Sequence, residues 1–173
     1  MLLPLESALR FVEGYKAFLL RVLVDEKLPN SPSTNQNLAT ALRHVKTNPA
    51  SIDRSIAALK SDGLPIEPAV ERAIRSLRFD HWIYLRHTKS YAIFVDVACE
   101  NAYHVRALTT PLNRIAGPPP LIFETGLFEY EGFFVCDGLI QHPVFIGPGY
   151  RPEISAAYTA LRKAGNVHAK TSA

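Results

Sequence analysis

The sequence has little cysteine, and this scarcity excludes a fold held together by several disulfides. Only Cys99 and Cys136 occur in 173 residues. Two cysteines cannot build the disulfide framework of a small secreted domain, and they suit a reducing compartment. We therefore expect a cytoplasmic protein.

Long hydrophobic runs are also missing. The most apolar stretch near the start, residues 17–24, is split by Arg21, and it is far shorter than the roughly 20 residues that span a bilayer. The first residues, Met1 to Pro4, lack the basic region of a secretory signal. The sequence thus predicts a soluble protein without a membrane segment.

A strong excess of charge of one sign is absent as well. The formal net charge is +3 and charged residues make up 20% of the chain, which is too mild to require nucleic acid or an anionic membrane as partner. Apolar residues make up 47%, which is enough for a core and argues against disorder. At this length we expect a single domain, 1–173.

The first part of the chain, residues 1–78, has the periodicity of helices. In the first helix, residues 5–26, an apolar face is predicted at spacings of three, four and seven: Leu5, Leu9, Val12, Leu19 and Leu23. Its second half is apolar almost all round. Such a helix is buried on more than one side, either within the fold or against a second copy, so we expect a homodimer.

Residues 79–150 change to the period of two that is typical of strands. Three strands, within 81–109, form a predicted meander, and a fourth covers 121–130. Glu131-Gly132 and Asp137-Gly138 are turn dipeptides so close together that one pair is expected to be a bulge. A strand over 139–146 follows, in which Pro143 marks an edge or bulge position.

These patterns predict an α+β fold in which N-terminal helices pack on a curved, partly barrel-like antiparallel sheet. A C-terminal helix is predicted over 151–165, and the tail, 166–173, is expected to fray.

Four side chains near the end of the sheet are candidates for catalysis. A hairpin at Asp137-Gly138 would bring Cys136 opposite His142, and a thiolate beside a histidine is a nucleophile that can also bind zinc. Glu124 and Asp137 are candidates for a carboxylate pair that acts as acid and base. A buried, inert thiol and solvated carboxylates are the commoner outcome, so neither a metal nor a cofactor is expected.

Two further groups are candidates for ligand binding. Gly147, Gly149 and Arg151 stand just before a predicted helix, where backbone amides and a guanidinium could hold an anion, although a rigid joint explains them equally. Trp82 and Tyr84 are candidates to line an aromatic pocket, but they could equally be core.

The order of helices and hairpin over residues 35–97 is that of a winged helix. Residues 43–89 contain nine Lys and Arg against five Asp and Glu, about +4, and such residues neutralise phosphates. The candidates for nucleic-acid contact are Arg72, Arg75, Arg78 and Lys89. A third strand after the hairpin is more than a wing needs, so nucleic acid is the alternative rather than the leading partner.

Two stretches, Tyr91 to Thr110 and Phe128 to Ile140 (FEYEGFFVCDGLI), resemble a group of uncharacterised bacterial proteins. The resemblance covers the C-terminal half and implies no activity. The leading hypothesis is a non-catalytic binding or assembly module that works through its aromatic sheet or first helix, with a protein partner or a second copy. A nucleic-acid-binding protein and a small hydrolase are the alternatives.

Overall fold

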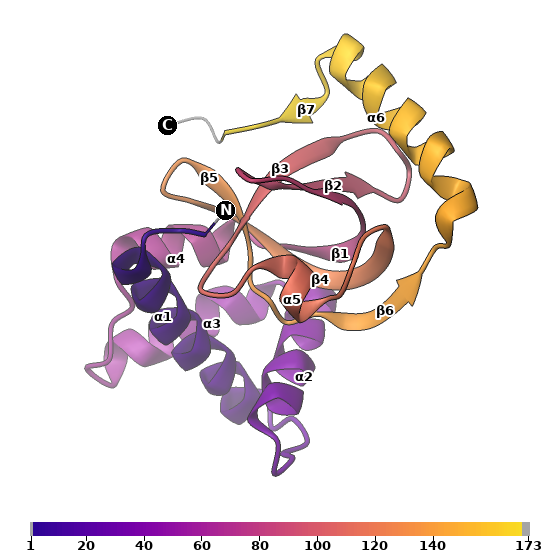
Figure 1. Cartoon of the computed structure of the whole chain (residues 1–173). Coiled ribbons are helices and arrows are strands. Elements are labelled where there is room, and N and C mark those ends of the chain that lie inside the picture. The colour runs from indigo at the N-terminus through magenta and orange to yellow at the C-terminus, as the bar shows by residue number, and fades with distance from the viewer. Residues whose placement is uncertain (1, 171–173) are drawn as a thin grey trace.

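A β-barrel between two groups of helices forms the centre of the computed structural model, which describes residues 2–170 (Figure 1). Four helices come first and lie together on one side of the barrel: α1 (Leu5–Asp25), α2 (Thr34–Thr47), α3 (Ala50–Ser61) and α4 (Pro68–Arg75). The strands are β1 (Arg78–His87), β2 (Ala92–Asp96), β3 (Ala102–Ala107), β4 (Leu121–Tyr130), β5 (Phe133–Cys136), β6 (Gln141–Phe145) and β7 (Val167–His168). The remaining elements are α5 (Leu112–Ile115), the 3-10 turn η1 (Pro148–Tyr150) and α6 (Arg151–Ala164). The predicted α+β class is confirmed.

The barrel closes through five strands. β1, β2 and β3 form the predicted antiparallel meander, and β4 closes the barrel by pairing with β1 on one edge and with β5 on the other. The β3–β5 pair is parallel, so the sheet is mixed rather than purely antiparallel. Between these two strands the chain runs through α5 and the whole of β4, and this long connection allows the parallel pairing.

β5 and β6 are two parts of one interrupted strand. β1 occupies one edge of β4 from Leu121 to Leu127, so β5 and β6 both lie on its other edge. β5 pairs with Leu127–Tyr130 and β6 pairs with the stretch from Leu121 to Glu124. Residues 137–140 leave the edge between them, and we call this segment the bulge.

The two turn dipeptides have different roles in the structure. Glu131-Gly132 forms the reversal between β4 and β5, while Asp137-Gly138 opens the bulge. The prediction that one pair is a bulge is confirmed. Pro143 lies on β6, at the end of the sheet order and beside a register shift, as predicted. A proline is tolerated there because it has no N–H to contribute to the ladder.

Three apolar clusters hold the layers together. Aromatic residues fill the barrel, among them Trp82, Tyr84, Phe94, Tyr103 and Phe123. A second cluster joins the helices to the outside of β4 and β5, where the ring of Phe11 contacts those of Phe128 and Tyr130. The third lies under α6. Helices therefore cover two sides of the barrel, because both faces of its strands carry apolar side chains.

The predicted apolar face of α1 was wrong in its first half. Leu5, Leu9 and Val12 are 67%, 47% and 36% exposed. The buried face is instead formed by Ala8, Phe11, Tyr15, Phe18, Leu19, Val22 and Leu23. Phe11 and Tyr15 decide this orientation because large rings bury more apolar area than leucines and pack against Phe128.

Two other expectations are corrected. Val167 and His168 do not fray but form β7, which pairs with β3. The hairpin over β1 and β2 is not a free wing, because β1 also pairs with β4 along seven residues. The turn between the two strands is closed by the amide of Thr88, which donates to the carbonyl of Tyr91. Among residues 2–170, no helix is long and apolar enough to cross a membrane.

Candidate functional site

The carboxylate of Asp137 is the centre of the bulge. The Thr125 hydroxyl and the Leu139 amide donate to its Oδ1 at 2.7 and 2.9 Å. The Tyr15 hydroxyl and the Gly126 amide donate to its Oδ2 at 3.1 and 3.3 Å. These four bonds tie α1, β4 and the bulge to one side chain. They also fill the acceptor capacity of a carboxylate, which has about four lone-pair sites.

Burial and hydrogen bonding compete at this carboxylate. Burial disfavours the charged form, whereas the bonds from Thr125, Leu139, Tyr15 and Gly126 favour it. Burial wins, and the pKa of Asp137 rises to about 6. Asp137 is therefore ionised for the most part at neutral pH and takes up a proton in mild acid.

The neighbouring thiol, that of Cys136, has little reactivity. Because Thr125 donates its single hydroxyl proton to Asp137, the thiol of Cys136 is left to donate to the Thr125 oxygen, at 3.3 Å. Burial, together with the negative charge of Asp137, raises the pKa of Cys136 to about 12. A thiol with such a pKa has almost no thiolate at neutral pH and is a poor nucleophile.

Gly126 makes room for the buried carboxylate. A Cβ at this position would lie 2.5 Å from Asp137 Oδ2 and 3.0 Å from Leu77 Cδ1. Only glycine lets β4 approach the carboxylate this closely.

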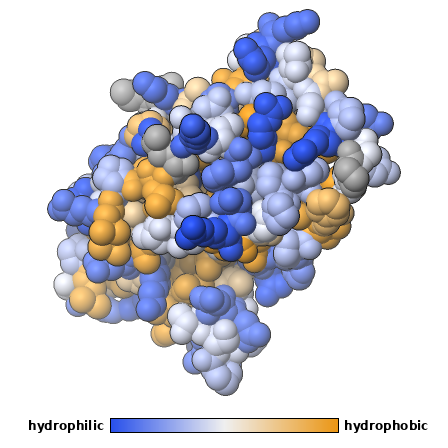
Figure 2. All heavy atoms as spheres, viewed as in Figure 1, coloured by the Kyte–Doolittle hydropathy of each residue, from blue (hydrophilic) through white to orange (hydrophobic). Residues whose placement is uncertain are grey.

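Three adjoining cavities surround the bulge, and we call them together the bulge groove. A cavity of about 280 Å³ lies between α1, α2 and Leu139, and a cavity of about 140 Å³ lies between Val12 of α1 and the segment around α5. Both are lined by Asp137. A third, of about 260 Å³, lies between α2 and the start of β6. Figure 2 shows hydrophobic side chains in the recess between the helices α1 and α2 and the barrel.

The walls of the bulge groove are mainly apolar, with a few polar groups. The apolar lining residues are Val12, Leu38, Ala39, Leu108, Leu112, Ile115, Leu139, Ile140 and Pro143. Lys16 is exposed at one mouth, and Asn35 lines two of the cavities. Gln141 lines the third cavity, and its Nε2 is buried without a hydrogen-bond partner among the described residues. Apolar walls with few polar groups are typical of ligand sites.

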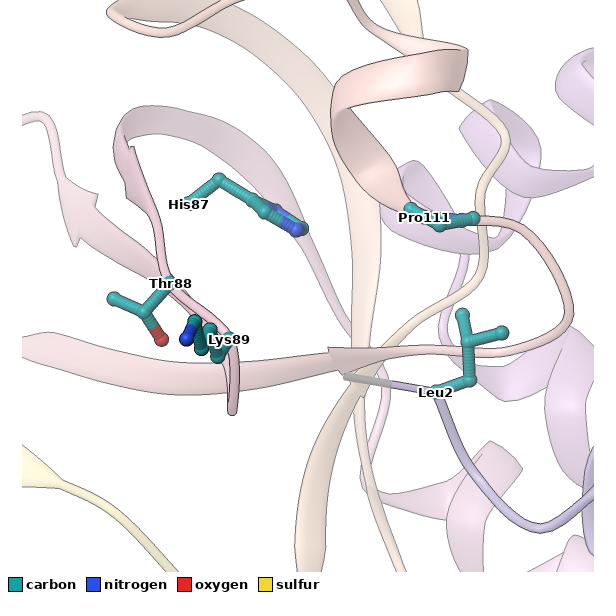
Figure 3. A pocket seen from close by; sticks show the side chains of 5 residues that line it. All are labelled: Leu2, His87, Thr88, Lys89 and Pro111. Carbon is teal, nitrogen blue, oxygen red and sulfur yellow. The ribbon is translucent and has the colours of Figure 1, made fainter.

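A larger hollow, of about 680 Å³, lies between the turn after β1, Leu2 and Pro111 (Figure 3). Its lining comes from Leu2, the turn residues His87, Thr88 and Lys89, and Pro111. The ring of His87 points toward Pro111 across the hollow (Figure 3). Five side chains cannot enclose so large a volume, so the hollow is open to solvent and offers a ligand little burial.

The four catalytic candidates do not lie together at one site in the structure. Cys136 lies in the barrel core and Asp137 is held by its four donors. Glu124 lies near Lys46 Nζ and His81 Nδ1, at 3.7 and 3.6 Å. His142 is exposed on β6, which follows β5 along the same edge of β4. The predicted hairpin that would bring His142 opposite Cys136 was therefore wrong.

The ligand candidates are separated as well. Trp82 and Tyr84 are 4% and 0% exposed and lie inside the barrel, where the indole N–H of Trp82 donates to the carbonyl of Thr125. The aromatic sheet is thus largely a core and not a binding surface. Gly147 and Gly149 lie just before α6, and Arg151 donates to the carbonyl of Pro119 at 3.1 Å. This bond makes Arg151 part of a joint between two segments.

Two of the nucleic-acid candidates are engaged by acidic residues. Arg75 forms ion pairs with Asp53 and Glu71, and Arg78 pairs with Glu129 and donates to the Tyr103 hydroxyl at 3.0 Å. Arg72 lies on α4, while Lys89 lies at the turn after β1, beside the open hollow. The two partners of Arg75 are already counted in the local charge of about +4, so of these pairs only that of Arg78 with Glu129 lowers the charge further. In residues 2–170, no group of three or more His, Cys, Asp or Glu side chains could hold a metal ion.

Several residues of the bulge groove and of the surroundings of Asp137 were not predicted. Tyr15, Lys16, Asn35, Thr125 and Gln141 come from separate elements, and their meeting depends on how α1 and α2 sit on the barrel. One signal was available in the sequence. Gly126 interrupts an apolar strand, and an isolated glycine in a strand indicates a bulge or a close approach.

The site therefore consists of a barrel, a helical layer and a mainly apolar groove around a buried carboxylate. We compared the chain with protein-family models, with curated proteins and with solved structures, and none of the three comparisons finds a match.

Proposed function

We propose that the protein is a non-catalytic binding module whose ligand site is the bulge groove. The observation that carries this proposal is the meeting of three cavities at a bulge whose buried carboxylate is already fully hydrogen-bonded. A carboxylate in this condition can hold the walls of a site in place, and a substrate proton would have to displace one of its four donors.

The position of the groove supports the same proposal. Ligand sites are frequent at the mouths of barrels and between packed elements. A β-bulge beside such a site is a recurrent means of directing a side chain out of the ladder. Here the bulge turns Asp137 toward α1 and leaves Leu139 and Ile140 as groove walls.

The compartment and the assembly state belong to the same proposal. Both cysteines are free thiols, which supports the expected cytoplasmic location. A homodimer remains our expectation for assembly, with the interface moved to the first half of α1. Hydrophobic side chains gather on the surface over the start of this helix (Figure 2).

A fragment screen tests the binding function. Isotope-labelled protein would be titrated with mixtures of small apolar fragments, and amide chemical shifts would be followed by NMR. We expect the largest shifts in residues 34–39 and 137–141. Ala39→Phe fills the wall of the third cavity and should abolish them, whereas Ala57→Phe, on the exposed face of α3, should leave them unchanged.

Two results would refute the proposal. One is an absence of fragments that shift these amides in the wild-type protein. The other is a set of binders that survive Ala39→Phe and shift mainly amides outside residues 34–39 and 137–141, since their site would then lie elsewhere.

A further inference from the structure

A group of basic and aromatic side chains lies between α6 and the outer face of the strands β1 to β3. The ring of His104, on β3, stacks on that of Tyr91 with the centroids 3.8 Å apart, and its Nε2 lies 2.9 Å from the hydroxyl of Tyr158, on α6. Arg86 of β1 and Arg162 of α6 complete the group, which we call the arginine cluster. None of its members lines the bulge groove.

An irregularity in β1 directs Arg86 to this face. Tyr84 lies inside the barrel, and strict alternation along the strand would place Arg86 inside as well. The register with β2 shifts between these two residues, so that Arg86 pairs with Ile93. Ile93 packs under α6 and lies opposite His104. Because partners across a ladder share a face, Arg86, Ile93 and His104 form one row under α6.

Arg162 reaches the same place from the helix. It follows Tyr158 by four residues, so the two side chains lie on one face of α6. Burial and the neighbouring Tyr91 raise the pKa of Tyr158, whereas the positive charges of Arg162 and Arg86 lower it. Both guanidiniums therefore lie near this hydroxyl, one from the helix and one from the barrel.

The arginine cluster has positive charge without a carboxylate to balance it. Neither Arg86 nor Arg162 forms an ion pair with a carboxylate of residues 2–170, whereas Arg21 and Arg75 do. The dipole of α6 favours a basic residue in its last turn, but it does not account for Arg86. Burial, together with the charge of Arg162, also lowers the pKa of His104. An anion between the two arginines would remove their mutual repulsion.

The two guanidiniums also indicate which anion fits. Both arginines are exposed, so a ligand from solution can reach them. A guanidinium presents a planar fork of N–H donors that binds two oxygens at once. A phosphate group has three strong acceptor oxygens and a charge between −1.5 and −2, so it can engage both forks. A carboxylate has only two oxygens and one charge, which is enough for one fork.

We propose that the arginine cluster is a phosphate-binding site, in which Arg86 and Arg162 hold the phosphate group between β1 and α6. His104 lies beside the bound anion and reports its charge. This site is separate from the bulge groove, and it does not depend on the function proposed for that groove.

Titration with three anions tests the site: inorganic phosphate, phenyl phosphate and acetate. The ring signals of His104 and the amide signals of residues 86–93 and 158–162 would be followed by NMR at pH 7.5, with the ionic strength held constant by sodium chloride. We expect saturable shifts with both phosphates and weaker binding of acetate. Phenyl phosphate that binds at least as tightly as inorganic phosphate assigns the site to phosphate esters, and tighter binding of inorganic phosphate assigns it to the free ion.

The histidine provides a second measurement. A negative charge beside an imidazole stabilises the protonated form. A pH titration in saturating inorganic phosphate should therefore give a higher pKa for His104 than a titration in chloride alone. An unchanged pKa would contradict a phosphate bound beside this ring.

Variants of the two arginines complete the test. Arg86→Gln and Arg162→Gln should each weaken phosphate binding by about 5- to 12-fold, between the effect of an exposed ion pair and that of a hydrogen bond to a charged group. Arg43→Gln changes an exposed arginine of α2 and should leave the affinity unchanged. An absence of saturable shifts in the wild type, acetate binding as tight as phosphate binding, or an affinity that both cluster variants retain would overturn the proposal.

Discussion

The buried carboxylate of Asp137 is hydrogen-bonded to both the helical layer and the barrel, and burial disfavours its negative charge. Four donors stabilise the ionised form, yet burial raises the pKa to about 6. Since the pKa of the group in the unfolded chain is near 3.8, the folded state binds the proton more tightly than the unfolded state. This group therefore stabilises the fold more in acid than at neutral pH, through the linkage of proton binding to folding.

The comparison of Asp137→Asn with the wild type isolates this effect. Between pH 7.5 and pH 4 the free energy of unfolding of the wild type should rise by about 2 kcal/mol relative to the variant. Groups such as Glu26, whose pKa is lowered by Arg54 and His44, act in the opposite direction but equally in both proteins. Urea unfolding at a series of pH values measures the difference. A wild-type advantage that shrinks as the pH falls would contradict the assigned role of Asp137.

At the scale of elements, β4 and the interrupted strand opposite it form the wall that carries the site. Gly126 is a point of very close approach between the two, because a Cβ there would lie 2.5 Å from Asp137 Oδ2. Gly126→Ala should lower the free energy of unfolding by about 2–4 kcal/mol, through overpacking and the loss of hydrogen bonds to Asp137.

A second glycine provides the control for this prediction. A Cβ added to Gly149 would meet no heavy atom of the described residues within 4 Å, so Gly149→Ala should change the stability by less than about 0.5 kcal/mol. Chemical denaturation of both variants measures the contrast. Equal losses in the two would show that Gly126 has no special role in the approach of β4 to the bulge.

Elements were predictable from the sequence wherever the periodicity was local. The meander of β1 to β3 and the strand β4 follow from neighbouring residues. The orientation of α1 did not follow, because Leu5, Leu9 and Val12 have the same spacing as a buried face. Only contact with Phe128 shows that the aromatic face is the buried one.

One residue of the site, Asp137, could be predicted from the sequence, but the way in which the other residues surround it could not. Asp137 stood out because Asp-Gly is a turn signal, but a hairpin and a bulge use the same dipeptide. The choice depends on β1, which occupies one edge of β4 and leaves the other edge to both β5 and β6. Such pairing joins residues far apart in the chain, such as Trp82 and Phe123, and no local pattern specifies it.

At the scale of the whole molecule, closure of the barrel explains why most of the aromatic residues of the sheet are buried in the core. A flat sheet would expose one face, and its Trp and Tyr side chains would form a surface for a partner. A closed barrel turns that face inward, so that Trp82, Tyr84 and Tyr103 become core. Surfaces for assembly must then be sought on the helices.

The first half of α1 is the surface at which we expect the dimer to form. Leu5, Leu9 and Val12 recur at spacings of four and three, and each is at least 36% exposed. In a two-fold dimer each of them would be buried twice, once from each copy. Full burial of a leucine contributes about 1.5–3 kcal/mol. Because Leu9 is 47% exposed, about half of this is available in each copy, so Leu9→Glu should raise the dimer dissociation constant by at least about 10-fold.

Sedimentation equilibrium over a range of protein concentrations measures this constant. Leu64→Glu is the control, because Leu64 is 66% exposed but follows α3 and is not part of α1. It should leave the dissociation constant within about twofold of the wild type. A wild-type protein that stays monomeric at every concentration would remove the dimer altogether. A dimer that survives Leu9→Glu would instead require another interface, and the exposed Val144 and Phe145 of the edge strand β6 would be the next residues to change.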